Sequence, residues 1–298
     1  MPLAVFPKCF LSQLCDDKTM TVREWIDMAA TLDIDGLEFY WGFTPRSDDE
    51  AREARRYAEA KNLPISMMCY SPDFIQSDPA RYREEIEQEK RAIEISAILG
   101  CRYCRVLSGQ RKPDIGRDKG VALAADAIAE LIPHAERHGI TLVLENHYKD
   151  GAWIFPEFAQ KMDIFLQLLS AIPESPFFGV NYDPSNTLIA GEDPIAMLHA
   201  VKHRVVTMHA SDRYLEGGTL DDLSRLEAHP RTGYASILKH GVIGQGLNDY
   251  DAIFSILAKA GFDGWISIED GQDPDCGMEH LRLSAEFLRA KMKEHGLR

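Results

Sequence analysis

The chain has 298 residues, of which 45% are hydrophobic and 27% charged, as in an ordinary soluble globular protein. Its formal net charge is −14, from 47 acidic and 33 basic residues, and no run rich in lysine or arginine offsets that balance. Nucleic acid calls for a basic face and a transmembrane helix for about 18 consecutive apolar residues, so neither a nucleic acid nor a membrane is an expected partner.

The first residues, MPLAVFPKCFLSQLCDDK, lack the basic start and the uninterrupted apolar run of a signal peptide. The sequence therefore predicts a cytoplasmic protein. The even count of six cysteines does not by itself imply disulfides in a chain of this length. Cys101 and Cys104 match C-x-x-C, but no second pair accompanies them, and they lie where a helix gives way to a strand. We interpret them as buried thiols.

Strand-like and helix-like segments alternate along the whole chain. Thr21 with Glu24 predicts a helix that begins with a capping box, and Asp78-Pro79 predicts a long helix closed by Gly100. The predicted strands are Leu3–Phe6, Gly36–Tyr40, Ile65–Tyr70, Tyr103–Ser108, Ile140–His147, Phe177–Asp183, Val205–Asp212 and Trp265–Asp270. Eight such strands, too apolar to face water, predict a (β/α)8 TIM barrel that forms a single domain over residues 1–298.

An open, doubly wound α/β sheet is the structural alternative. Such a sheet would normally carry a glycine-rich phosphate-binding turn after an early strand. The only comparable segment, Gly244-Gln245-Gly246, lies late in the chain and lacks the G-x-G-x-x-G form. The sequence therefore favours the closed barrel.

The connection after the seventh predicted strand is unusually long, from Arg213 to about Asn248. Loops of this length in compact domains are usually functional lids or insertions with short helices of their own. Because the segment follows the strand that carries His209, we expect this insertion, about 213–248, to lie over the active-site face.

Four polar side chains stand at the carboxyl ends of four successive strand-like runs: Glu145, Asp183, His209 and Glu269. These ends converge at one mouth of a parallel barrel. Three carboxylates and one imidazole facing a common point indicate a divalent metal ion. The set is oxygen-rich and hard, which suits Mn²⁺, Mg²⁺ or Co²⁺ better than a structural zinc, and Zn²⁺ remains an alternative.

Alternation of side chains along a strand predicts what lies around these four residues. If Glu145 points inward, so does His147 two residues later. The same parity places Asn181, Thr207 and Ser267 one layer beneath Asp183, His209 and Glu269. Small polar groups there could orient the ligand side chains.

The pattern also suggests a reaction. A divalent ion that binds a carbonyl and a neighbouring hydroxyl stabilises the enediolate formed when the α proton leaves. Two glutamates on opposite sides of the bound carbon, Glu145 and Glu269, could then remove and return the proton.

The motifs LVLENH, VNYDPSN, VTMHASDR, GQGLNDYDAIFSIL and WISIED resemble the sugar phosphate isomerase/epimerase family of xylose isomerase-like barrels, over nearly the whole chain. The resemblance to its ketose 3-epimerases implies one divalent ion, usually Mn²⁺, held by Glu145, Asp183, His209 and Glu269, with the two glutamates as the acid/base pair. It also implies that Arg213 contacts substrate and that the chain forms a homodimer or homotetramer.

One position departs from that family pattern. Those epimerases have a histidine three residues after the aspartate ligand, whereas this chain has Asn186. We expect Asn186 and His147 to lie at the substrate, with His147 supplying the missing imidazole. Further pocket candidates are the aromatic residues Trp41 and Tyr70, which can stack on sugar faces, together with Lys8 and Glu38.

The sequence thus predicts a divalent-metal-dependent isomerase or epimerase that acts on a small-molecule carbohydrate through an enediolate. A keto-polyol (inosose-type) dehydratase is the alternative, since it begins with the same proton abstraction and then expels a β-hydroxyl. An endonuclease IV-like DNA repair enzyme would need several more strand-end histidines for three zinc ions. A sugar-binding protein without activity would have no need of the Glu145/Glu269 pair.

Overall fold

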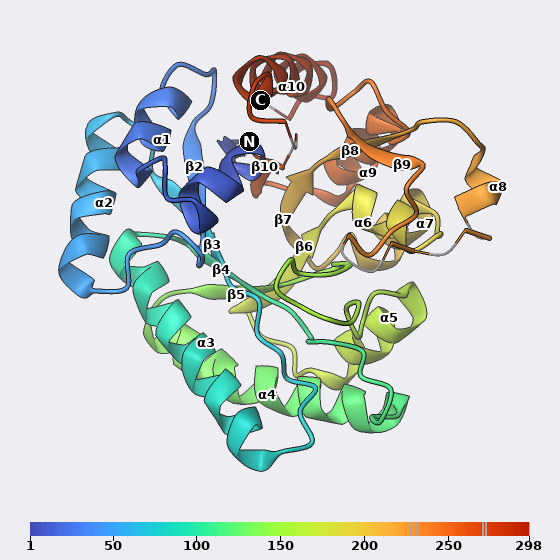
Figure 1. Ribbon diagram of the computed structural model, residues 1–298. Coiled ribbons are helices and arrows are strands. Elements are labelled where there is room, and N and C mark those ends of the chain that lie inside the picture. The colour runs from blue at the N-terminus through green and yellow to red at the C-terminus, as the bar shows by residue number, and fades with distance from the viewer. Residues whose placement is uncertain (224, 227, 230–231, 270, 272, 298) are drawn as a thin grey trace.

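A closed barrel of eight parallel strands forms the centre of the molecule, in the order β1-β10-β7-β6-β5-β4-β3-β2 (Figure 1). The computed structural model describes residues 1–223, 225–226, 228–229, 232–269, 271 and 273–297. The barrel strands are β1 (Leu3–Val5), β2 (Gly36–Tyr40), β3 (Ile65–Cys69), β4 (Tyr103–Val106), β5 (Thr141–Glu145), β6 (Phe178–Tyr182), β7 (Val205–Ala210) and β10 (Trp265–Ile268). The predicted barrel and all eight predicted strands are confirmed, except that Asp270 lies outside the described residues.

Helices between the strands cover the outside of the barrel (Figure 1). They are α1 (Val22–Ala29), α2 (Asp48–Ala60), α3 (Pro79–Leu99), α4 (Arg117–Arg137), α5 (Met162–Ala171), α6 (Pro184–Ile189), α7 (Pro194–Val201), α9 (Tyr250–Ala260) and α10 (Gly277–Glu294). In the part of the chain that the structure describes, no helix is both long and apolar enough to cross a membrane.

The three predicted helix boundaries are confirmed in detail. The Thr21 side chain accepts from the Glu24 amide, while the Glu24 carboxylate accepts from the Thr21 amide, which completes the capping box of α1. Asp78 caps α3, and Gly100 ends it in the left-handed region at φ +81°, where glycine carries no steric penalty.

The predicted polar layer inside the barrel is present. Asn181, Thr207 and Ser267 are all buried, on β6, β7 and β10. The Thr207 hydroxyl donates to the Asn181 side-chain oxygen at 2.9 Å. The alternation of side chains along these strands therefore follows the predicted parity.

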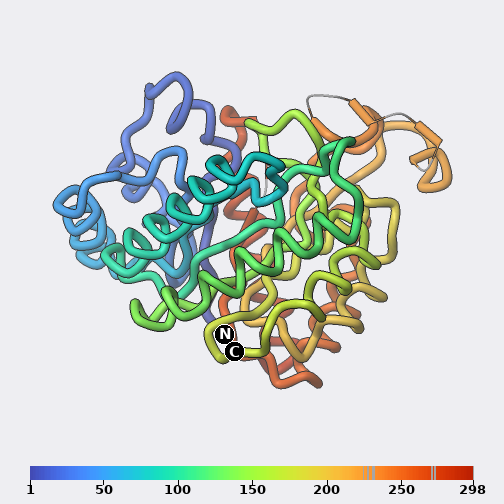
Figure 2. The backbone as a smooth tube through the Cα atoms, turned by 90° about the horizontal axis from the view of Figure 1, so that it is seen from below, coloured from blue at the N-terminus to red at the C-terminus, as the bar shows by residue number. Residues whose placement is uncertain are grey.

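The long segment after β7 contains a two-stranded antiparallel ribbon, with β8 (Asp212–Leu215) paired to β9 (Leu238–Gly241), and the short helix α8 (Leu220–Leu223). Its residues 224, 227 and 230–231 lie outside the described part of the chain. The segment, in orange, projects from one end of the barrel, and both termini lie towards the other end (Figure 2). Asp212 anchors its base by accepting from the amides of Gly244 and Gly246 at 2.9 and 3.0 Å.

Candidate metal and substrate site

The four strand-end residues predicted to act together do meet in space. Glu145, Asp183, His209 and Glu269 each place a potential ligand atom within 4.8 Å of the others. Glu145 and His209 belong to β5 and β7, while Asp183 and Glu269 follow β6 and β10 directly. All four are buried, and Glu269 is the most exposed at 7%.

Asp183 is held by the start of the helix that follows it. Its Oδ1 accepts from the amides of Ser185 and Asn186 at 2.7 and 3.2 Å, as the N-cap of α6, and from the Ser211 hydroxyl at 2.7 Å. No hydrogen bond between described residues reaches Oδ2. The helix cap therefore fixes Oδ1 of Asp183 and leaves Oδ2 available to bind a metal ion.

Glu145 lies between two cationic groups and an amide. Arg105 on β4 donates to Oε2 at 2.8 Å, while Asn186 donates to Oε1 at 3.0 Å. His209 Nδ1 lies 3.2 Å from the same Oε1. Burial alone would raise the pKa of Glu145, but the positive charges of His209 and Arg105 outweigh it and lower the pKa to about 2.

Glu269, like Glu145, is paired with a basic side chain. Lys8, which follows β1, donates to Oε1 at 3.1 Å, and His209 Nδ1 lies 3.4 Å from Oε2. Burial opposes ionisation here too, yet Lys8 and His209 hold the pKa of Glu269 well below its ordinary value. The two glutamates thus face one imidazole nitrogen, and each is paired with a separate basic residue.

Asp183 is the carboxylate without such a partner, since the described residues place no lysine or arginine within 4.0 Å of it. Burial, together with the negative charges of Glu269 and Glu145, raises the pKa of Asp183 to about 7. A divalent cation among the four groups would offset this buried negative charge. The oxygen-rich ligand set, its burial and the oxygen of Asp183 that remains open all fit such an ion.

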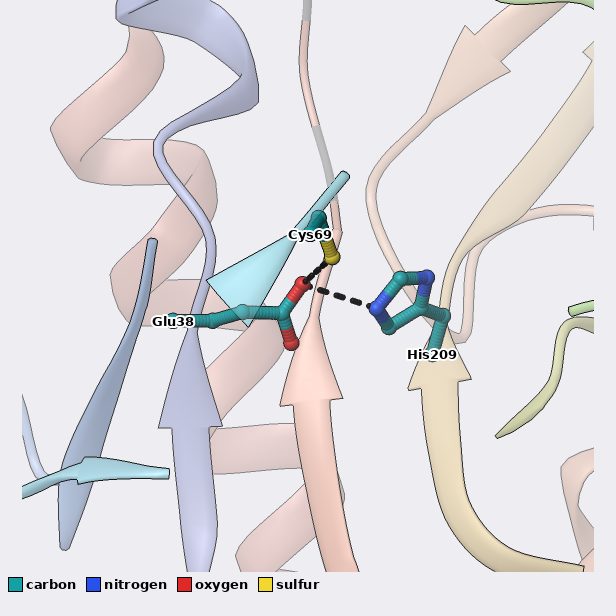
Figure 3. Close-up of side chains that lie close together, drawn as sticks. All are labelled: Glu38, Cys69 and His209. Atoms are coloured by element: carbon teal, nitrogen blue, oxygen red, sulfur yellow. Dashed lines mark hydrogen bonds and ion pairs between the residues drawn. The ribbon is translucent and has the colours of Figure 1, made fainter. Parts of the chain in front are cut away.

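His209 is held on its other side as well. Its Nε2 lies 2.8 Å from Oε1 of Glu38, a fully buried residue in the middle of β2 (Figure 3). The Cys69 thiol, on β3, donates to the same oxygen over 3.0 Å. Burial raises the pKa of Cys69 to about 12, so the thiol keeps its proton and acts as a donor.

A cavity of about 660 Å³ opens beside the four residues. Lys8, Arg105, His147 and Glu269 line it, and Thr232 from the long segment borders it. Its size suits a small molecule. The predicted insertion thus contributes Thr232 to the border of this cavity.

A comparison with known families decides the assignment of the fold. A family model described as the xylose isomerase-like TIM barrel matches residues 26–291. The chain belongs to this family. A solved D-tagatose 3-epimerase-like protein has a TM-score of 0.76 at 16% identity, covering 99% of this chain and 98% of that chain. The IOLI protein, solved with a bound zinc atom, has a TM-score of 0.74 at 16% identity and covers 99% of each chain. At these identities, the likenesses show the fold alone.

Curated relatives are similar over a shorter stretch. An inosose dehydratase of Bacillus thuringiensis (strain Al Hakam) is 26% identical over 172 residues, which are 56% of this chain and 53% of the relative. The chain therefore matches about half the length of that relative. A D-tagatose 3-epimerase-like protein and an inosose dehydratase thus both stand among the proteins to which this member of the xylose isomerase-like family is similar.

Three other predicted substrate residues lie near the site. His147 lines the cavity and stacks on Tyr148, with ring centroids 5.1 Å apart. Asn186 binds Glu145, as described above. Arg213 is 1% exposed, with its guanidinium over the rings of Tyr234 and Tyr148 at 4.7 and 5.9 Å. Its Nε and Nη1 have no hydrogen-bond partner among the described residues.

The two predicted aromatic residues lie elsewhere. Trp41 and Tyr70 pack edge to face at 5.2 Å, the guanidinium of Arg46 covers Trp41 at 3.7 Å, and the Tyr70 hydroxyl donates to Gln88 at 2.8 Å. Neither is among the described residues that line the cavity. Tyr40, one residue before Trp41, lines it instead, because the alternation along β2 turns Tyr40 and Trp41 to opposite faces.

The polar layer does not orient the ligand carboxylates as the sequence suggested. Asn181 Nδ2 and Ser267 Oγ have no hydrogen-bond partner among the described residues, and Thr207 binds Asn181. The groups that orient the carboxylates come from strand ends and loops, namely Arg105, Lys8, Asn186 and Ser211. The prediction placed the layer correctly and assigned it the wrong contacts.

Sequence reasoning missed Arg105. The residue is 4% exposed in β4, where it also donates to the Ser71 hydroxyl at 2.7 Å. Ser71 in turn donates to Asp150 at 2.7 Å, and the Tyr40 hydroxyl donates to the same carboxylate oxygen at 3.3 Å. An arginine within the apolar run Cys-Arg-Val-Leu was the available signal, because a cation inside a barrel needs a buried anion.

Proposed function

We propose that this chain is a divalent-metal-dependent isomerase or epimerase that transfers a proton at the carbon next to a carbonyl of a sugar or a closely related polyol. The observation that carries the proposal is the paired arrangement of Glu145 and Glu269. Their carboxylates lie 3.2 and 3.4 Å from one nitrogen of His209, and they come from strands separated by β6 and β7. A substrate carbon between them would have a carboxylate on each side.

The surrounding residues would have distinct tasks. Asp183 and His209, with the two glutamates, would hold the ion, for which we propose Mn²⁺. When bound, such an ion acts as a Lewis acid toward two neighbouring substrate oxygens. Arg105 and Lys8 keep the glutamates ionised and in place, so that each can accept a proton. His147 lines the cavity, and two N–H groups of Arg213 have no hydrogen-bond partner in the described part of the chain. We assign both residues to substrate hydroxyl or carbonyl oxygens.

A dehydratase is the second candidate, favoured by the names of the curated relatives and by Lys8. Lys8 Nζ lies 3.1 Å from Glu269 and lines the cavity. Burial disfavours its charged form, but Glu269 and other nearby anions more than offset that and raise the pKa of Lys8. Lys8 would therefore stay protonated and could give a proton to a β-hydroxyl as the C–O bond breaks, so that water leaves.

Proton exchange with solvent tests the proposal. Incubated in D₂O with Mn²⁺ and a panel of ketoses and keto-polyols, the enzyme is expected to place one deuterium on the α carbon of a recovered epimer or isomer, detected by mass spectrometry and NMR. In D₂O the glutamate that donates to the opposite face of the carbon carries deuterium from the solvent, so the new C–H bond of the product is a C–D bond.

The other possible products of the same incubation distinguish between the candidate functions. A product lighter by one water supports the dehydratase candidate, in which the first proton transfer is shared. Conversion to the same product in H₂O and in D₂O, without deuterium from the solvent in that product, would argue against a glutamate acid/base pair.

A further inference from the structure

His209 lies between two sets of carboxylates, and each of its ring nitrogens faces one of them. Nδ1 is directed at Glu145 and Glu269, 3.2 and 3.4 Å away, on the side of the candidate metal site. Nε2 is directed away from that site, at Glu38 Oε1, 2.8 Å away. Figure 3 shows Glu38, Cys69 and the imidazole of His209 converging from three strands of the barrel.

The burial of the Glu38 carboxylate is energetically unfavourable. It is 0% exposed in the middle of β2, and a buried carboxylate without compensation costs several kcal/mol. No lysine or arginine of the described chain lies within 4.0 Å of it, and its Oε2 has no hydrogen-bond partner there. Its partners are the Cys69 thiol, which donates to Oε1 at 3.0 Å, and His209.

The direction of these hydrogen bonds fixes the state of the imidazole. A carboxylate oxygen only accepts hydrogen bonds, so Oε1 of Glu38 accepts from Nε2 as well as from the Cys69 thiol. Nε2 must then carry a proton, and a neutral imidazole has only one. When a divalent ion replaces the second ring proton, the lone pair is therefore on Nδ1, the nitrogen that faces Glu145 and Glu269.

We propose that Glu38 is a positioning residue for the metal site, whose carboxylate holds the His209 proton on Nε2 and so presents the Nδ1 lone pair to the divalent ion. The inference rests on the proposed function, since it assumes that His209 is a ligand. A carboxylate behind a ligating imidazole also raises the basicity of the ring, and losing such a partner typically costs 10–100-fold in metal affinity.

The chain offers a matched control for this test. Glu89 in α3 is also 0% exposed, and it also accepts from a cysteine thiol, that of Cys104, at 3.6 Å. No histidine in the described part of the chain forms a hydrogen bond or ion pair with it. Glu38→Gln and Glu89→Gln thus make the same substitution at two buried glutamates that each accept from a thiol, and only the first removes the carboxylate behind His209.

Metal affinity is the direct readout. Mn²⁺ is titrated into metal-free wild type, Glu38→Gln and Glu89→Gln in competition with a chromophoric chelator. We expect Glu38→Gln to bind Mn²⁺ about 10–100-fold more weakly than wild type and Glu89→Gln to bind it as wild type does. Equal Kd values for wild type and Glu38→Gln would overturn the role of Glu38 while leaving the proposed function intact. A wild type that binds no divalent ion would overturn both.

A second measurement uses the unmodified protein, so it decides the matter even if Glu38→Gln does not fold. In Zn²⁺-loaded wild type labelled with ¹⁵N-histidine, the ring of His209 is expected to carry its proton on Nε2. A proton on Nδ1 would overturn the proposal, because Glu38 would then face a nitrogen without hydrogen.

Discussion

Glu145→Gln and Glu269→Gln are each expected to lower kcat by about 10²–10⁴-fold, the usual contribution of a positioned general acid or base. Glutamine keeps the size of the side chain, and its amide can still accept a hydrogen bond, but it cannot take up a proton. The measurement is turnover of the substrate identified in the D₂O panel, at Mn²⁺ concentrations high enough to saturate each variant. Saturation separates lost proton transfer from weaker metal binding.

Glu89→Gln is again the suitable control, because it changes a buried glutamate that lies outside the cavity lining. It should retain the kcat of the wild type. If either Glu145→Gln or Glu269→Gln were to turn over at more than a tenth of the wild-type rate, that glutamate would not be part of the acid/base pair.

Arg105→Met is expected to be the most destabilising single change near the site, by about 3–5 kcal/mol in the metal-free protein. The side chains of Arg105 and Glu145 are 5% and 0% exposed and lie 2.8 Å apart, so removing the arginine leaves a carboxylate buried without its cation. Urea unfolding followed by circular dichroism measures the free energy of unfolding.

Two comparisons make this result specific. Arg55→Met breaks an exposed i,i+4 pair with Glu59 and should cost less than about 1 kcal/mol. Adding Glu145→Leu to Arg105→Met removes both charges, so the double variant should be more stable than Arg105→Met alone. A loss below about 1 kcal/mol for Arg105→Met would mean that Glu145 is compensated by other groups.

The barrel and the four strand-end residues were predictable because both follow from local patterns. The signals that predict them depend only on residues close together in the sequence: short apolar runs, helix caps such as Thr21, and the alternation of side chains. The convergence of Glu145, Asp183, His209 and Glu269 then follows from barrel geometry, since every parallel strand ends at the same mouth.

The contacts across the barrel were not predictable in the same way. Arg105 and Glu38 are single charged residues within apolar strands, and nothing nearby in sequence names Glu145 or His209 as their partner. Trp41 is not among the described residues that line the cavity, for a related reason. It follows the end of β2, and one step of alternation gives the cavity to Tyr40 instead.

The central claim is that Glu145, Asp183, His209 and Glu269 hold one divalent ion. Anomalous diffraction from crystals grown with Mn²⁺, recorded near the manganese absorption edge, locates such an ion directly. We predict one strong peak per chain, within coordination distance of one carboxylate oxygen from each of the three acidic residues and of Nδ1 of His209. A fully occupied metal elsewhere in the barrel with none among these four, or three metals at its mouth, would contradict the account.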